Sequence, residues 1–158
     1  SNGLTYYIKK NAKPEKKVEL RLVLNVGSIL EDENQLGLAH FIEHMNFNGS
    51  KHFPKNDLVN YLQTIGVKFG ADLNAYTSFD ETVYILPLPS DKSEIVENGF
   101  TVLEDWAGGA LLTDEEIEKR SAESRAECIA TNRHQVHIHT DEQGVDTSKS
   151  ESLKLIFR

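Results

Sequence analysis

The sequence predicts an α+β fold, in which an antiparallel or mixed β-sheet is covered by helices. Two observations carry this prediction. Segments with the two-residue alternation of strands occur in two pairs, and each pair is followed by two segments with helical periodicity. The chain has 158 residues, of which 39% are hydrophobic, and this is enough for one compact domain with a core.

Four strands are expected, at residues 4–8, 18–26, 67–77 and 82–88. The second is the clearest, because every second residue is apolar, and this predicts one buried face made of Val18, Leu20, Leu22 and Leu24. Pro87 and Pro89 close the last strand.

Four helices are expected between and after these strands. The first follows Asn34, a candidate cap, and ends at Asn48-Gly49. The others cover residues 56–65, residues 91–107 with Ser90 as the cap, and a segment that opens at the capping-box pattern Thr113-x-x-Glu116. We expect the third to pack on the sheet through Val96, Phe100, Leu103 and Trp106.

Composition excludes several classes of protein. A formal charge of -8 argues against a nucleic-acid partner, because neutralising phosphates needs clustered Lys and Arg. We find no apolar run of the roughly 20 residues that a membrane-spanning helix needs. The single cysteine, Cys128, excludes an internal disulfide and has no neighbouring pattern that would make it a nucleophile.

The first helix carries the chemistry of the chain, in the stretch His-Phe-Ile-Glu-His at residues 40–44. Its apolar residues form one stripe, Leu38, Phe41, Ile42 and Met45, and a second stripe on the opposite side holds His40, Glu43, His44 and Phe47. His40 and His44 lie one helical turn apart, so their imidazoles can bind one Zn²⁺. Glu43 is not needed as a ligand and can serve as general base toward a water that the metal activates.

The alternative is that two histidines and a glutamate share a solvated helix face without binding metal. His134, His137 and His139 also group together, but a polar tail more often leaves such residues exposed to solvent.

Residues 37–45, Gly-Leu-Ala-His-Phe-Ile-Glu-His-Met, resemble the signature of the M16 zinc peptidases, the inverzincin family that includes pitrilysin, insulin-degrading enzyme and the mitochondrial processing peptidase. The block at 73–78 and Glu81-Thr82-Val83-Tyr84 are similar to the family's strand pair beside the metal. The resemblance implies a zinc-dependent endopeptidase with a single M16-type metallohydrolase domain. It also implies that Asn74, Ala75, Tyr76 and Thr77 form an edge that receives peptide as an added strand.

The resemblance further implies a third zinc ligand on a later helix. The register of the family block places it at Glu127, with Glu123, one turn earlier, as the alternative. Arg120 stands where the family usually has another glutamate, and the apolar pattern fades beyond this point. We therefore expect an M16-like peptidase domain at 1–119 and a divergent or flexible continuation at 120–158. A solvated acidic helix face is the other interpretation of these glutamates.

Two functions follow as hypotheses. The first is a zinc metallopeptidase that acts on peptides or unfolded polypeptides together with a homologous M16 domain or subunit. The second is a truncated or non-catalytic homologue that serves as a structural or peptide-binding subunit. The resemblance also suggests a bacterial periplasmic or cell-envelope location.

Overall fold

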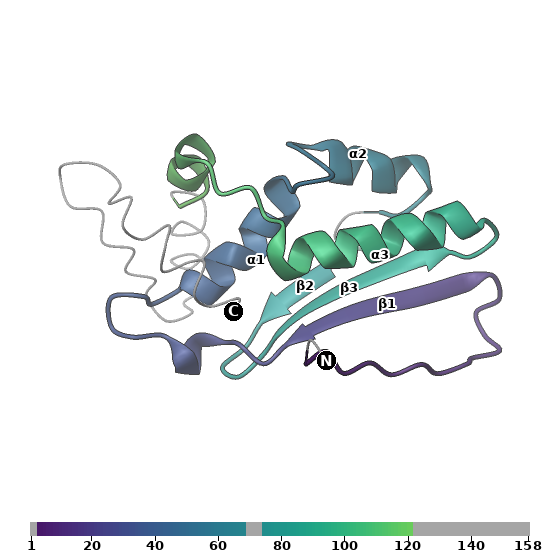
Figure 1. Cartoon of the computed structure of the whole chain (residues 1–158), viewed down its shortest axis with the longest axis horizontal. Helices are drawn as coiled ribbons and strands as arrows, with labels where there is room; N and C mark the ends of the chain where they lie inside the picture. The colour runs from purple at the N-terminus through teal and green to yellow at the C-terminus, as the bar shows by residue number, and fades with distance from the viewer. Residues whose placement is uncertain (1–2, 69–73, 122–158) are drawn as a thin grey trace.

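The computed structural model describes residues 3–68 and 74–121 (Figure 1). The elements in chain order are β1 (Lys17–Leu24), a 3₁₀ turn η1 (Ser28–Leu30), α1 (Leu38–Asn48), α2 (Asp57–Thr64), β2 (Asn74–Thr77), β3 (Thr82–Pro89) and α3 (Ser93–Gly108). A further helical segment occupies residues 114–121. Two helices separate β1 from the consecutive strands β2 and β3, and an antiparallel sheet with helices packed on it is an α+β fold.

The described strands form one antiparallel sheet in the order β1-β3-β2. β1 pairs with β3 along its whole length, from Lys17 opposite Pro89 to Leu24 opposite Thr82, and β2 pairs with the first half of β3. The predicted apolar face of β1 is confirmed, because Leu20 is buried and Val18, Leu22 and Leu24 pack against the same core.

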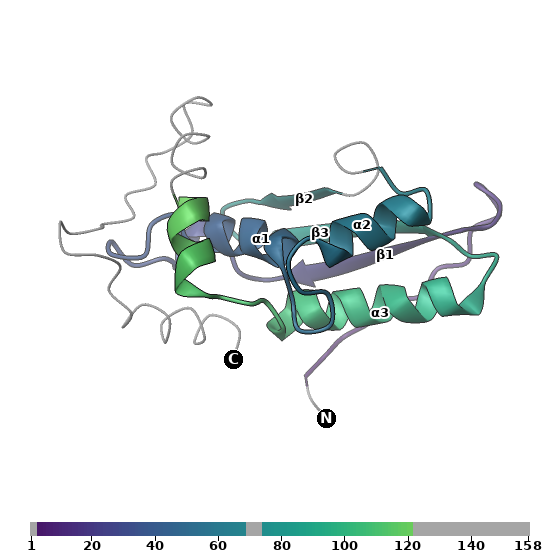
Figure 2. The same ribbon diagram turned by 90° about the horizontal axis from the view of Figure 1, so that it is seen from above.

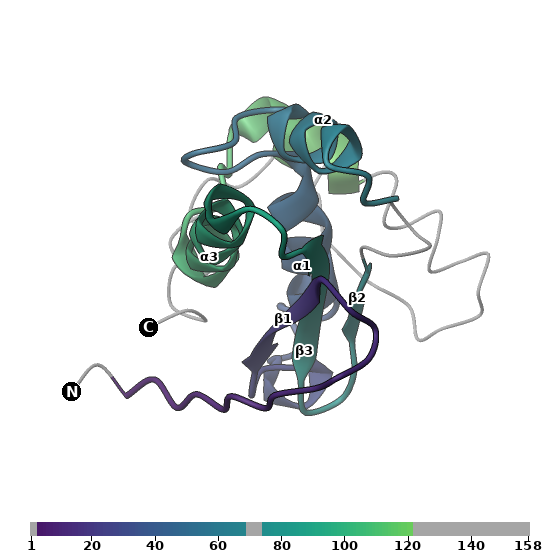
Figure 3. The ribbon, with the colours of Figure 1, turned by 90° about the vertical axis from the view of Figure 1, so that its right-hand side faces the viewer.

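The helices gather on one side of this sheet (Figures 2 and 3). The main core joins the strands to α2 and α3, and its buried members are Leu20, Leu58, Leu62, Val67, Tyr84, Leu86, Leu88, Val102 and Trp106. Burial of this much apolar surface is the main stabilising contribution to the domain.

α1 contributes a second, smaller core with the segment that follows α3. Phe41, Ile42 and Met45 are buried and pack with Leu38, Leu112 and Ile117. The apolar stripe of the first predicted helix is therefore confirmed. Helix 114–121 begins after Thr113, as the capping-box pattern predicted, and Ile117 donates its backbone N–H to the Thr113 carbonyl at 2.9 Å.

The side chain of Asn48, the last residue of α1, holds helix 114–121 in place. Its Nδ2 donates to Glu116 Oε2 at 2.5 Å, and its Oδ1 accepts from Arg120 Nε at 3.1 Å. The predicted boundary between residues 119 and 120 falls inside this helix and stays a prediction.

One predicted strand, at residues 4–8, is wrong, and another, at residues 67–77, is wrong in part. Residues 4–8 have no regular structure and are exposed, because β propensity makes a strand only where a ladder partner exists, and the described partner of β1 is β3. Residues 67 and 68 are not strand either, since the backbone N–H of Val67 donates to the Leu62 carbonyl at the end of α2, at 3.0 Å. Residues 69–73 lie outside the described part of the chain.

Two predicted helix caps are also wrong. Asn34 lies in a turn, and α1 begins four residues later at Leu38 after Gly37, whose φ is 86°. Ser90 does not cap α3, which begins at Ser93 after Lys92. The backbone N–H of Ser90 instead donates to the Lys16 carbonyl at 2.9 Å, which ties the end of β3 to the start of β1.

The packing face of α3 differs from the prediction at two residues. Trp106 is buried, as expected, but Phe100 is 59% exposed. Ile95, in place of Val96, is among the residues packed against the core. The neighbouring Gly99 is buried instead, and a Cβ built there would lie 2.3 Å from Leu88 Cδ1. α3 therefore contacts the sheet through Gly99, which lets the helix backbone come close to the strands. Phe100, the next residue, then faces outward.

Within the described ranges, none of the helices combines the length and apolar character needed to cross a bilayer.

Candidate metal centre

The two histidines of α1 point their ring nitrogens at one another. His40 Nε2 and His44 Nε2 lie 3.0 Å apart, and the ring centroids are separated by 4.6 Å with an angle of 71° between the ring planes. Both side chains are half-buried. The one-turn spacing in the sequence therefore produces the convergence of two imidazoles that was predicted.

This geometry fits a shared metal ion. Zn–N bonds are about 2.0–2.1 Å long, so two nitrogens on one tetrahedral zinc stand roughly 3.3–3.4 Å apart. The observed 3.0 Å differs from that separation by a few tenths of an ångström. Small ring rotations are enough to place both nitrogens on one ion.

Residues beyond the helix are needed to complete a coordination shell. Among residues 3–68 and 74–121, no three His, Cys, Asp or Glu side chains form a group that could hold a metal ion. The candidate third ligands, Glu127 and Glu123, lie outside the described residues, as do Cys128 and the histidines at 134, 137 and 139. The third ligand therefore stays a prediction.

Glu43 is oriented by a residue of the sheet. Its Oε2 accepts a hydrogen bond from Thr77 Oγ1 at 2.9 Å, and Thr77 is the last residue of β2. Ala75 and Thr77 lie opposite Tyr84 and Thr82 in the ladder, so both face the side of the sheet on which α1 packs. The carboxylate is thus held next to the histidine pair by a contact between residues 34 positions apart.

β2 forms the outer strand of the described sheet, since it pairs only with β3 there. Asn74, Ala75, Tyr76 and Thr77 make up the whole strand, and they are the residues predicted to receive peptide. Side chains alternate along it, so Asn74 and Tyr76 face away from α1. The structure therefore brings the predicted peptide edge and the histidine pair together at Thr77.

Both tyrosines of this region have a raised pKa, so each phenol is a weaker acid than free tyrosine. A hydrogen bond from Tyr76 to Glu81 raises the pKa of the Tyr76 phenol. Burial raises the pKa of Tyr84, which is fully enclosed in the core. Tyr84 is completely buried, whereas Tyr76 is 44% exposed.

The sequence interpretation missed one residue of this region. Glu31 is the first residue of the acidic stretch 31–33, and its carboxylate accepts hydrogen bonds from the backbone N–H groups of Gly37 and Ala39 at the start of α1. Local cap patterns do not reach six residues upstream of a helix, so only the folded structure reveals this contact.

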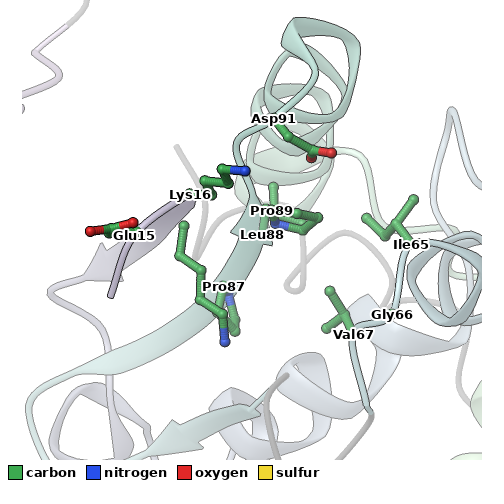
Figure 4. Close-up of a pocket in the computed structure, with 10 residues that line it drawn as sticks. Glu15, Lys16, Ile65, Gly66, Val67, Pro87, Leu88, Pro89 and Asp91 are labelled. Atoms are coloured by element: carbon green, nitrogen blue, oxygen red, sulfur yellow. The ribbon is translucent and has the colours of Figure 1, made fainter. Parts of the chain in front are cut away.

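A separate hollow of about 390 Å³ lies at the far end of the sheet (Figure 4). Its lining comes from the start of β1, the end of α2 and the end of β3, and comprises Glu15, Lys16, Lys17, Ile65, Gly66, Val67, Pro87, Leu88, Pro89 and Asp91. Thr82, opposite Thr77, is seven residues from Pro89 along β3, which is roughly 23 Å at 3.3 Å per residue. This hollow is therefore not part of the histidine site.

The family model of insulinase, peptidase family M16, matches residues 6–155. The chain belongs to this family. The protein named "Probable zinc protease PqqL" of Haemophilus influenzae is 43% identical over 118 residues, which cover 75% of this chain and 13% of that protein. Its namesake in Escherichia coli K12 is 40% identical over 117 residues, which cover 74% of this chain and 13% of that protein.

Solved structures agree with this assignment. The first half of the periplasmic protease PqqL from Escherichia coli superposes with a TM-score of 0.66 at 34% identity, over 82% of this chain and 26% of that one. Pitrilysin gives a TM-score of 0.60 at 30% identity, over 73% of this chain and 12% of that one. The α+β M16 fold that was expected is therefore confirmed, and the chain spans about an eighth of the length of the curated relatives it matches.

Proposed function

We propose that this chain carries the metal helix of a zinc-dependent endopeptidase. His40 and His44 supply two ligands, Glu43 acts as general base, and Glu127, or Glu123 in its place, supplies the third ligand. When bound, zinc supplies a Lewis acid and lowers the pKa of a water molecule. The relatives named as zinc proteases support this assignment.

The observation that carries the proposal is the convergence of His40 Nε2 and His44 Nε2 at 3.0 Å beside a carboxylate fixed by Thr77. Two imidazoles alone can bind a metal ion but supply no base, and a carboxylate alone has no activated water to act on. A carboxylate whose direction is fixed beside such a pair is suited to accept the proton of the attacking water and to return it to the leaving amine.

The substrate that fits this site is an extended peptide. β2 presents its outer backbone edge beside α1, and a peptide added there as a further strand would pass the histidine pair. Main-chain hydrogen bonds to Asn74–Thr77 bind any sequence in extended form, so unfolded polypeptides are the substrate class.

A homologous M16 unit completes the enzyme in this proposal. The chain spans 13% of its curated relatives, and one solved relative is described as the first half of a periplasmic protease. We therefore propose that peptide cleavage needs a second, homologous part and takes place in the periplasm.

Elemental analysis of the purified chain tests the metal site. The wild type should bind about one Zn²⁺, and His44→Ala should lose it, because one remaining imidazole cannot hold the ion. His52→Gln is the matched control, since it removes a histidine outside the pair, and its zinc content should equal that of the wild type. Equal zinc in the wild type and His44→Ala would remove the site. A folded wild type without zinc would point to the non-catalytic subunit instead.

The role of Glu43 is tested in the assembled, active form. Glu43→Gln should keep zinc but lose hydrolysis by about 10²–10⁴-fold, because the amide cannot take up the proton of the water. Glu118→Gln, which changes an exposed glutamate on helix 114–121, should cleave like the wild type. Turnover retained by Glu43→Gln would exclude it as the base.

A further inference from the structure

We propose that Glu31 is a positioning residue for the metal helix and that its carboxylate holds the first turn of α1, and with it His40, in the orientation that binds the ion. The inference rests on the proposed zinc site. It concerns a residue that touches neither the ion nor the peptide.

The contacts of Glu31 span the start of the helix. Its Oε2 accepts the backbone N–H of Gly37 at 2.7 Å, and its Oε1 accepts that of Ala39 at 2.8 Å. The first N–H groups of a helix have no partner within the helix. They also form the positive end of the helix dipole, which favours a negative charge nearby. A carboxylate that uses both oxygens in this way forms two charge-assisted hydrogen bonds.

The helix needs this outside partner because of the residue at its cap position. Gly37 occupies that position with φ at 86°, in the left-handed region, and has no side chain with which to cap. A serine or aspartate there would be strained in this conformation. The cap is therefore supplied from the preceding loop.

His40 depends on this cap more than His44 does. It directly follows Ala39, in the first turn, where helices fray most easily. His44 lies one turn further in and is followed by Met45, which is completely buried. Loosening of the first turn would therefore move His40 Nε2 away from His44 Nε2 and leave His44 in place.

Glu31 is itself fixed to the strand pair that holds Glu43. Ser28 and Ile29 donate their backbone N–H groups to the carbonyls of Ser78 and Phe79, at 3.1 and 2.8 Å, in the turn that follows Thr77. Gly27 permits this approach, since a Cβ there would lie 2.4 Å from the Ser78 oxygen. The loop, the turn after β2 and the first turn of α1 thus form one connected support.

The experiment compares Glu31→Gln with Glu33→Gln in the full chain. Both variants remove one negative charge from the same loop, but Glu33 is exposed and makes no part of the cap. Zinc affinity is measured by competition with a chelator, and the absorption spectrum of the cobalt-loaded protein reports ligand geometry. Amide hydrogen exchange of the metal-free protein reports protection of the Gly37 and Ala39 N–H groups.

Glu31→Gln should weaken zinc binding by about tenfold, in the range found for residues that orient metal ligands, and should change the cobalt spectrum. Glu33→Gln should match the wild type in both. The urea midpoint is measured beside these, and the cobalt spectrum separates the two effects, because a loss of global stability alone does not alter the spectrum of the folded protein. Glu31→Asp, which keeps the charge but is one methylene shorter, should recover part of the affinity.

Equal zinc affinity in Glu31→Gln and Glu33→Gln would overturn the inference. If the wild type binds no zinc, the proposed function fails, and the exchange data alone decide the inference. Faster exchange at Gly37 and Ala39 in Glu31→Gln then supports the cap, and unchanged exchange overturns it.

Discussion

The two faces of α1 are held in place by different kinds of interaction. The polar face carries His40 and Glu43, is half-buried, and is oriented by hydrogen bonds: Glu31 accepts from the first turn of the helix, and Thr77 donates to Glu43. The apolar face, made of Phe41, Ile42 and Met45, is buried in the protein.

This difference separates two requirements on one short helix. Burial of apolar surface stabilises strongly but has no preferred direction, whereas hydrogen bonds fix the direction of the groups they join. The apolar face therefore keeps α1 in the fold, and the hydrogen bonds at the polar face orient its side chains. We expect substitutions in the buried core and substitutions near the polar face to affect stability and zinc chemistry separately.

The largest expected effect on stability comes from Trp106→Ala. Trp106 is 1% exposed, stacks on Tyr84 with ring centroids 5.1 Å apart, and donates its Nε1–H to the Asn46 carbonyl. Its removal should lower the free energy of unfolding by about 3–5 kcal/mol. Phe100→Ala, on the exposed side of the same helix, should change it by less than about 0.5 kcal/mol.

Circular dichroism during urea unfolding is the suitable measurement, because Trp106 is the only tryptophan of the chain and its fluorescence is lost in the variant. Equal losses in the two variants would show that α3 packs through another face than the structure describes.

The second effect concerns Asp105, a buried carboxylate that joins α3 to the loop after α1. Its Oδ2 accepts from Ser50 Oγ at 2.6 Å and from the His52 backbone N–H at 2.9 Å, and its Oδ1 lies 2.8 Å from His52 Nδ1. Asp105→Asn should cost about 1–3 kcal/mol in the free energy of unfolding, because the amide nitrogen cannot accept a hydrogen bond from one of these donors.

The same contacts predict a dependence on pH. Burial by itself raises the pKa of the Asp105 carboxyl, but the hydrogen bonds from Ser50 and His52 outweigh it and hold the pKa below its ordinary value. A lowered folded-state pKa stabilises the protein above the unfolded pKa of about 3.9, and this stabilisation is lost as the pH falls through the folded value.

The difference in urea midpoint between wild type and Asp105→Asn should therefore be larger at pH 5 than at pH 3. Glu104→Gln, the exposed neighbour on α3, serves as the control with no such change. A difference that is constant with pH would mean that the pKa of the Asp105 carboxyl is the same in the folded and unfolded states.

Much of the fold could be predicted from the sequence because its elements are amphipathic. The alternation of β1 and the apolar stripe of α1 each mark one buried face, and both are confirmed. The prediction for α3 was wrong at Phe100 because the helix approaches the sheet through Gly99, which has no apolar side chain to count. Periodicity shows which residues are apolar and cannot show where two backbones come close.

The contacts around the candidate site could likewise be predicted only where they are local in the sequence. The pairing of His40 with His44 is local, since four residues make one helical turn, and the sequence alone predicted it. The bonds of Glu43 with Thr77 and of Asp105 with Ser50 join residues 34 and 55 positions apart, and no local pattern encodes such contacts. Glu31 was missed because it caps from the preceding loop, across a turn whose conformation the sequence did not reveal.

The sharpest test of the comparison comes from Thr77→Val, for which we expect only a small effect on stability. The substitution keeps the shape of the side chain and removes the hydroxyl that donates to Glu43 Oε2 at 2.9 Å. Because Thr77 is only half-buried, the free energy of unfolding should change by less than about 1 kcal/mol. In the assembled, active form, kcat should fall by about tenfold with KM near the wild-type value, since the base loses its orientation while the peptide edge remains.

Thr82→Val is the matched control, because Thr82 lies directly opposite Thr77 in the ladder. Its hydroxyl donates to the Val26 carbonyl at 2.8 Å, and the residue is 3% exposed. Its loss leaves a carbonyl without this bond, so Thr82→Val should lower the free energy of unfolding by about 1–3 kcal/mol and leave kcat unchanged. Thr77→Val should therefore lower kcat and Thr82→Val should lower stability, although each variant removes one hydroxyl and the two positions are paired in the ladder. If Thr77→Val lowers stability as much as Thr82→Val and leaves kcat unchanged, the hydrogen bond to Glu43 only supports the fold, and the division between the two faces of α1 fails.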